Sequence, residues 1–227
     1  MEKIILTPDP MLYIIATPIG NLKDITLRAI EVLKSVDLIA CEDTRHSKIL
    51  LGHYAIKTPT TSFFQHNRFT KGEYILRLLK EGKDVALVSD AGTPGILDPG
   101  YNLINLAIKN NIEITAIPGP VAFINALVLS GKPSHKFIFE GFLPNRPLAR
   151  RNRLKALAQL KCTLVFYESC HRILAALQDI QEVFGEREII CARELTKKFE
   201  EIKRGSAGDI AGQFRQQKPR GEFVVVI

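Results

Sequence analysis

Residues 84–100 read DVALVSDAGTPGILDPG, and this stretch decides the fold that we predict for the chain. Residues 84–88 form a short apolar run, which is typical of a buried strand. The loop that follows is long and rich in glycine and proline, so its backbone can approach a ligand closely and keep its shape. In parallel α/β sheets, ligands bind outside the carboxyl ends of the strands. A long loop after a buried strand is more often functional than structural, which makes 89–100 a candidate binding loop.

Short apolar runs alternate with stretches of helical period on both sides of this segment. This alternation predicts a parallel sheet with helices on both faces. Residues 130–134 are typical of a linker, and a second alternating pattern follows them. We therefore predict an α/β protein with two α/β domains, residues 1–131 and 132–227. The expected strands are 12–16, 37–41, 84–88, 113–117, 137–142, 163–167, 188–192 and 222–227, and the expected helices are 24–36, 44–51, 71–81, 101–111, 150–160, 170–183 and 208–215.

The composition is that of a globular protein, with 46% hydrophobic and 24% charged residues in 227. No apolar run approaches the roughly 18 residues that span a bilayer, and the first apolar stretch is too short for a signal peptide. We therefore expect a cytoplasmic protein without a membrane partner.

The four cysteines are Cys41, Cys162, Cys170 and Cys191. They form no C-x-x-C pair and no zinc-like spacing with histidine. We expect reduced thiols and no metal site, with Cys41 and Cys191 buried in strands.

The net charge of +7 is confined to the second half of the chain. Residues 132–227 carry 18 Lys/Arg against 11 Asp/Glu, whereas residues 1–131 carry 13 of each. This asymmetry favours a polyanionic partner, although a generally basic, solvated surface is an equal alternative on charge alone. Five cations lie in 146–155 without an acidic residue among them, and arginine forks suit phosphates. The low aromatic content, 7% with no Trp, gives no sign of a base-stacking platform.

Other polar clusters also follow predicted strands, at residues 42–46, 166–172 and 192–198. For 42–46, a helix cap with an exposed ion pair is an alternative to a functional role, and slightly the better one. The sequence contains neither G-x-G-x-x-G nor G-x-x-x-x-G-K-[ST], which argues against an ordinary P-loop nucleotide hydrolase.

Short motifs occur in order over nearly the whole chain: LYI (12–14), TPIGNL (17–22), DIT (24–26), EDTR (42–45), SDAGTP (89–94), DPG (98–100), PGP (118–120), EGFLP (140–144), FYE (166–168), HR (171–172) and ARELTK (192–197). Each motif is weak alone, but together they are specific. By these motifs the chain resembles the tetrapyrrole methylase superfamily. Within it, the chain is similar to the branch that methylates a cytidine ribose 2′-hydroxyl in small-subunit ribosomal RNA.

The resemblance implies two α/β domains with the methyl donor, S-adenosylmethionine, in a donor-binding cleft between them. It implies ribosomal RNA or the small ribosomal subunit as partner, and a homodimer. The residues that it implies for the donor site are Pro18, Ile19, Gly20, Ser89, Asp90, Ala91, Gly92, Thr93, Ile96, Val121 and Ala122 from the first domain, and Tyr167, Glu168 and Leu195 from the second.

Methyl transfer from a sulfonium is an in-line displacement, so alignment of the reacting atoms is the main requirement. A ribose hydroxyl is weakly acidic, and a base or a cation should assist. Asp43, Glu168 and Glu194 are candidate bases, while Arg45, Arg193 and Lys197 are candidates to support developing charge. A ribose 2′-hydroxyl distinguishes RNA from DNA. The residues expected to bind RNA are Arg146, Arg150, Arg151, Arg153, Arg172, Arg193 and Lys197.

Two other functions remain open from the sequence. A small-molecule methylase of the tetrapyrrole type would share fold and donor, but the basic second half and the 42–45 motif count against it. A non-enzymatic RNA-binding factor for ribosome assembly would bind RNA without binding the donor. A nucleotide hydrolase is a distant third.

Overall fold

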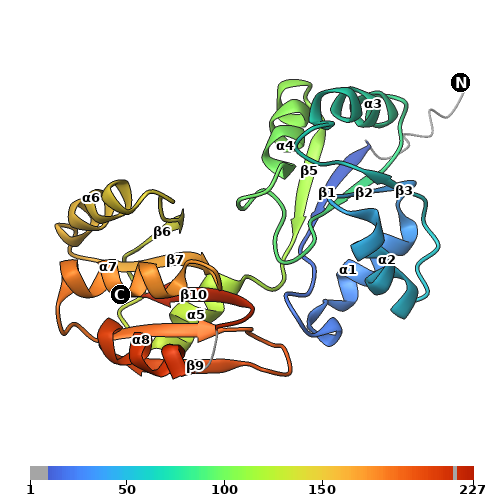
Figure 1. The fold of residues 1–227 in the computed structure, drawn as a ribbon. Helices are drawn as coiled ribbons and strands as arrows, with labels where there is room; N and C mark the ends of the chain where they lie inside the picture. Colours follow the sequence, from blue (N-terminus) through green and yellow to red (C-terminus); the bar gives the residue numbers. More distant parts are fainter. Residues whose placement is uncertain (1–9, 217–218) are drawn as a thin grey trace, which may run out of the picture. The chain divides into compact units, whose positions relative to one another are not determined.

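The computed structural model describes residues 10–216 and 219–227. The chain divides into two compact units, residues 1–121 and 122–227, each built around one sheet. Figure 1 shows the elements of each unit. The prediction of two α/β domains is confirmed at this level.

The first unit has a five-stranded sheet in which every pair is parallel, in the order β3-β2-β4-β1-β5. The central strands are apolar on both sides, as expected where helices cover both faces. In chain order the elements are β1 (Met11–Ile15), the 3₁₀ helix η1 (Leu22–Asp24), α1 (Leu27–Ser35), β2 (Leu38–Cys41), α2 (Thr44–His53), β3 (Thr60–Ser62), α3 (Arg68–Lys80), β4 (Val85–Val88), α4 (Gly100–Lys109) and β5 (Glu113–Ile117).

Successive side chains of these strands point to opposite faces, which gives the first unit two cores. On one face, Ile39 and Val88 pack with Leu33 of α1 and Leu51 of α2. On the other face, Leu12, Leu38 and Leu87 pack with residues of α3 and α4. The loops at the carboxyl ends of the strands are thus carried on a sheet that is held from both sides.

The second unit has a mixed sheet in the order β6-β7-β10-β8-β9, in which only β6 and β7 are parallel. The last strand, β10, lies in the middle and runs antiparallel to both neighbours. In chain order the elements are α5 (Ala122–Ser130), β6 (Phe137–Phe142), α6 (Pro147–Ala158), β7 (Thr163–Ser169), α7 (Ile173–Phe184), β8 (Ile189–Arg193), β9 (Glu201–Gly205), α8 (Ala207–Gln216) and β10 (Glu222–Val226).

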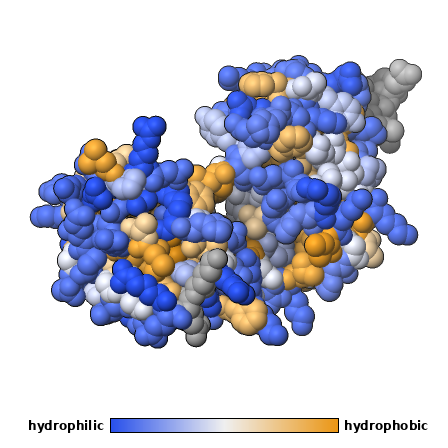
Figure 2. All heavy atoms as spheres, viewed as in Figure 1, coloured by the Kyte–Doolittle hydropathy of each residue, from blue (hydrophilic) through white to orange (hydrophobic). Residues whose placement is uncertain are grey.

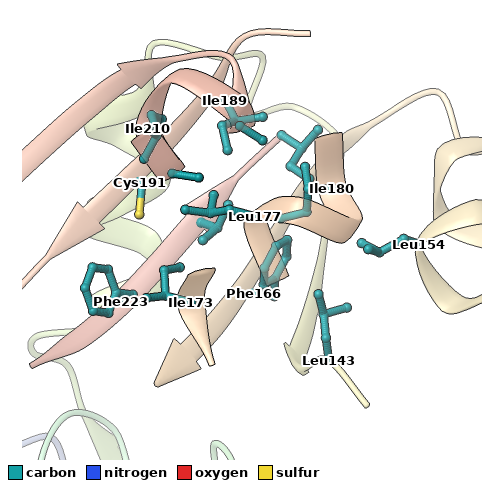
Figure 3. Close-up of a cluster of buried hydrophobic side chains, with 14 of the residues drawn as sticks. Leu143, Leu154, Phe166, Ile173, Leu177, Ile180, Ile189, Cys191, Ile210 and Phe223 are labelled. Atoms are coloured by element: carbon teal, nitrogen blue, oxygen red, sulfur yellow. The ribbon is translucent and has the colours of Figure 1, made fainter. Parts of the chain in front are cut away.

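One face of this sheet carries a single large core, shown in Figure 3. Phe166 of β7 and Phe223 of β10 pack there against Ile173 and Leu177 of α7 and Leu154 of α6. The opposite face is covered in part by α5, which contacts β7 and β10.

Three elements lie outside the predicted pattern. The strands β3 and β9 were not predicted, because Thr60–Ser62 is short and β9 reads EIKRG, which is polar and charged. Helix α5 was not expected either, and it packs with the second unit, so the predicted boundary at Gly131 falls at the end of this helix. Propensity is weak in such segments, and tertiary contacts decide their structure.

Two further observations concern the described residues. None of their helices is both long and apolar enough to cross a membrane. All four cysteines are free thiols, with Cys41 and Cys191 buried, as predicted.

Candidate functional site

In the first unit, the loop after β1 and the long loop after β4 are joined by backbone hydrogen bonds. The N–H of Thr17 donates to the carbonyl of Gly92 at 2.8 Å, and the N–H of Gly92 donates back to Thr17 at 3.0 Å. The buried hydroxyl of Thr17 also donates to the carbonyl of Ser89 at 3.1 Å. Because β1 and β4 are neighbours, their carboxyl ends bring together the predicted donor segments 18–20 and 89–93.

The segment after β5 reaches the same edge of the sheet. Gly119 passes so close to the end of β1 that a Cβ atom would lie 2.7 Å from the Cβ of Ala16. Only glycine allows this approach. The hydroxyl of Thr93 donates to the carbonyl of Pro120 at 3.5 Å. Val121 follows directly and ends the first unit, whereas Ala122 begins α5 in the second.

The loop after β2 is tied to the long loop by two carboxylates. The N–H of Asp43 donates to Asp90 Oδ1 at 3.0 Å, and the N–H of Asp90 donates to Glu42 Oε2 at 3.4 Å. Burial raises the pKa of Glu42, and the charges of Asp90 and Asp98 act in the same direction. Two half-buried carboxylates therefore lie at the edge where the glycine- and proline-rich loops meet.

Asp43 and Arg45 form a bidentate ion pair at the start of α2. Arg45 donates from Nε to Asp43 Oδ1 at 3.1 Å and from Nη2 to Oδ2 at 2.7 Å, and its side chain is 89% exposed. Asp43 also caps the helix by accepting the N–H of Arg45 at 2.8 Å. These bonds from Arg45 lower the pKa of Asp43 to about 2. Asp43 is therefore a weak base, and the geometry favours a role in orienting Arg45.

These features of the first unit suit S-adenosylmethionine. When bound, this donor would present a sulfonium and an ammonium group, which the carboxylates of Glu42 and Asp90 can balance at one sheet edge. The exposed side chain of Ile96 offers apolar surface for a nucleobase. The chemistry of these residues therefore fits the donor that the sequence motifs imply.

In the second unit, Tyr167 and Glu168 point to opposite faces of β7. The Tyr167 ring is half-buried, and burial raises the pKa of its hydroxyl. The Glu168 side chain is fully shielded from solvent, accepts the N–H of Ser169 at 2.8 Å and lies 3.2 Å from Arg172 Nη2. Arg172 in turn donates to the carbonyl of Leu143 at 2.5 Å. The Glu168 carboxylate thus holds the segment before α7 and is covered from solvent.

The segment after β8 is unusual because Glu194 and Thr196 both have left-handed backbone angles, with φ of 52° and 65°. Such angles are strained, above all for a β-branched residue, and they are common at functional sites. Leu195 between them is buried. The hydroxyl of Thr196 is buried without a hydrogen-bond partner among the described residues.

Glu194 is held by neighbouring groups in this segment. Its Oε1 accepts Lys197 Nζ at 2.9 Å and the N–H of Glu222 at 3.1 Å. Burial raises the pKa of Glu194, but these hydrogen bonds outweigh burial and leave the pKa lowered. As a base, Glu194 therefore has to release Lys197.

The residues predicted to bind RNA differ in their exposure to solvent and in whether an acidic side chain already pairs with them. Arg150 is buried and donates from Nε to Asp179 Oδ2 at 2.6 Å. A phosphate can reach Arg150 only if this pair breaks, so the structure gives Arg150 a structural position and not a surface one. The sequence gives no sign of this ion pair, because Asp179 lies on α7 and not within the basic stretch.

Five more of these residues pair with acidic side chains. The pairs are Arg151 with Asp179 and Glu182, Arg153 with Glu140, Arg172 with Glu168, Arg193 with Glu201, and Lys197 with Glu194 and Glu222. Within residues 10–216 and 219–227, Arg146 and Lys155 have no acidic partner, and both are exposed. These two are the most accessible cations of the basic stretch. Figure 2 shows hydrophilic residues over most of the surface around α6.

Comparison with known proteins gives the family. A family model described as Tetrapyrrole (Corrin/Porphyrin) Methylases matches residues 11–211. The chain belongs to this family. Among tetrapyrrole methylases it is similar to the Thermotoga maritima protein named "Ribosomal RNA small subunit methyltransferase I", with 50% identity over 216 residues that cover 95% of this chain and 97% of the relative.

Solved tetrapyrrole methylases share the fold. A cobalt precorrin-4 methyltransferase superposes with a TM-score of 0.72 at 18% identity and covers 97% of both chains. A uroporphyrin-III C-methyltransferase from Thermus thermophilus, complexed with S-adenosyl homocysteine, superposes with a TM-score of 0.65 at 14% identity and covers 95% of this chain and 96% of that one.

Sequence reasoning missed two groups of site residues. The link between Glu42 and Asp90 joins segments that are far apart in the sequence, and only the adjacency of β2 and β4 brings them together. The acids Glu140 and Asp179 give no local sign that they neutralise arginines of α6. The polar residues at neighbouring strand ends were the signal for the first group, and the second had none.

Proposed function

We propose that this chain transfers the methyl group of S-adenosylmethionine to a cytidine ribose 2′-hydroxyl in small-subunit ribosomal RNA. The observation that carries the proposal is the 50% identity, over 95% of the chain, to a relative named as a small-subunit ribosomal RNA methyltransferase. The loops joined at one edge of the first sheet support donor binding, and the charge of the second unit supports an RNA substrate.

The residues of the first unit divide into binding and catalytic roles. We assign donor binding to the joined segments 18–20 and 89–93 with Ile96 and Val121, and, from the second unit, to Ala122, Tyr167, Leu195 and the backbone of Glu168. When bound, S-adenosylmethionine supplies a methyl group activated by the adjacent sulfonium charge. Glu42 and Asp90 place carboxylates at the sheet edge where that cation would be held.

Arg45 is the group that we assign to the reaction step. Asp43 holds the Arg45 guanidinium by two hydrogen bonds. Because the exposed guanidinium is already fixed, it loses little conformational entropy when the substrate binds. A fixed cation stabilises the negative charge that develops on the ribose oxygen as its proton leaves. Asp43 acts through Arg45, and Glu194 remains the candidate base of the second unit, provided that Lys197 releases it.

The direct test is methyl transfer with purified protein. Tritiated S-adenosylmethionine is incubated with small ribosomal subunits and with free ribosomal RNA, and the modified ribose is located by mass spectrometry of nuclease digests. We expect a single 2′-O-methylcytidine. Transfer to porphyrinogens and not to RNA would show a small-molecule methylase. RNA binding without donor binding in calorimetry would show an assembly factor.

Two further properties belong to this proposal. Ribosomal RNA as substrate places the enzyme in the cytoplasm, where ribosomes are assembled. The resemblance to the family implies a homodimer, which sedimentation velocity tests: a monomer at micromolar concentration would contradict it.

A further inference from the structure

Five aromatic side chains of the second unit gather on the α5 side of its sheet. Phe123 of α5 stacks on Phe139 of β6, with ring centroids 4.1 Å apart and an interplanar angle of 15°. Tyr167 of β7 meets the Phe139 ring edge-on at 5.1 Å, and Phe142 meets Tyr167 at 5.8 Å. Phe137 lies 6.4 Å from Phe123. We call these five residues the aromatic row.

A β-bulge brings Phe142 into this row. Phe139 pairs with Val165, so an unbroken register would pair Phe142 with Glu168, on the face covered by α7. The register shifts between Phe139 and Phe142, and Phe142 pairs with Tyr167 instead. Gly141 permits the shift with a left-handed φ of 74°. Bulges re-aim side chains and are frequent beside functional sites.

The re-aimed side chain stays in contact with solvent. Phe142 is 52% exposed, although the core face of the same sheet would have buried it. The other members of the row are partly buried and hold their rings in fixed positions. The row therefore ends in a fixed, exposed aromatic ring.

The unit that carries this ring has a net positive charge. Residues 122–227 carry 18 Lys/Arg against 11 Asp/Glu. Arg146, four positions after Phe142 in the chain, is exposed at the start of α6. An exposed aromatic ring on a basic unit suits a base together with its phosphates, and suits a second copy of this equally basic surface less well.

We propose that the aromatic row is a stacking subsite for an unpaired base of the RNA substrate, with Phe142 as its platform. The inference rests on the proposed function, because the ligand is the RNA of that reaction. The low aromatic content gives no hint of such a platform, since its members come from three separate segments of the chain.

The test compares Phe142→Ala and Phe142→Tyr with a control, Phe69→Ala, which removes a more exposed ring from α3 of the first unit. Binding is measured by fluorescence anisotropy with a labelled single-stranded fragment of small-subunit ribosomal RNA. An abasic ribose-phosphate oligomer of the same length is the second probe. We expect Phe142→Ala to bind the RNA about ten-fold more weakly, with an unchanged salt slope and unchanged affinity for the abasic probe.

Phe142→Tyr and Phe69→Ala should bind both probes like the wild type. Near-ultraviolet circular dichroism and thermal unfolding check that each variant is folded. Equal RNA affinity of Phe142→Ala and wild type would overturn the subsite while methyl transfer by the wild type still supports the proposed function. The same result with loss of self-association in sedimentation would identify the row as an interface between copies. Wild-type protein that binds no RNA would overturn both proposals.

Discussion

Arg150 of α6 and Asp179 of α7 form an ion pair that is almost excluded from solvent, with Nε and Oδ2 2.6 Å apart. Arg151 donates to the other oxygen of the same carboxylate at 3.2 Å. The pair joins two helices that cover the core of the second unit. The most central arginine of the basic stretch therefore holds the fold together.

We expect Arg150→Ala to destabilise the second unit by about 3–5 kcal/mol, because it leaves the buried Asp179 carboxylate without its main partner. Urea unfolding followed by circular dichroism measures the loss. Arg153→Ala, which breaks an exposed pair, is the matched control and should cost less than about 1 kcal/mol. A stable Arg150→Ala protein with weakened RNA binding would place Arg150 in the RNA site instead.

The pairing of Asp43 with Arg45 predicts a catalytic and not a binding defect. Arg45→Ala should lower kcat by about 10²–10³-fold, which is the effect of removing one group that stabilises developing charge. The Kd for S-adenosylmethionine should change by less than about two-fold. Single-turnover kinetics and calorimetry measure the two quantities. Unchanged turnover in Arg45→Ala and Asp43→Ala would remove this motif from the reaction.

The same pair predicts a pH dependence. The bonds from Arg45 lower the pKa of Asp43 to about 2, so the carboxylate stays ionised and the fork intact throughout neutral and mildly acidic pH. The interaction is present above the ordinary aspartate pKa and is lost only as pH falls through about 2. A kcat profile between pH 5 and 9 should therefore show no step that Asp43→Asn abolishes; such a step would show Asp43 acting as the base.

Gly119 offers a test of the donor edge. In Gly119→Ala the new Cβ would lie 2.7 Å from Ala16 Cβ, so the segment after β5 has to move away from β1. We expect donor affinity to fall at least about ten-fold, since displacements near 1 Å can cost more than that. Gly52→Ala in α2, where the new Cβ meets nothing within 4 Å, is the control and should bind the donor normally. Equal affinities would exclude this edge from the site.

The accessible cations predict the salt dependence of RNA binding. Arg146→Ala and Lys155→Ala should each lower the slope of log Kd against log salt by about 0.7–0.9, the share of one phosphate contact. Arg151→Ala, whose guanidinium is already engaged by Asp179, should change the slope less. Identical slopes in all three variants and the wild type would place the RNA phosphates elsewhere.

The sequence alone was sufficient for the class of fold and for the position of the loops that follow its strands. The apolar run 84–88 and its neighbours alternate with helical segments, and a parallel sheet places the ends of such strands at one edge. It was also sufficient for the family, because the motifs are local and keep their order. The free, buried Cys41 and Cys191 follow from the same apolar pattern.

Tertiary structure decided which charges are available and which way side chains point. Ion pairs such as Arg150–Asp179 and contacts such as Asp90 with Asp43 join residues far apart in the sequence, where no local pattern records the partner. The bulge at Gly141 moves Phe142 from one face of the sheet to the other, and a shift of one residue reverses every side chain beyond it. Alternation in the sequence predicts two faces, but only the pairing of strands determines which face a residue occupies.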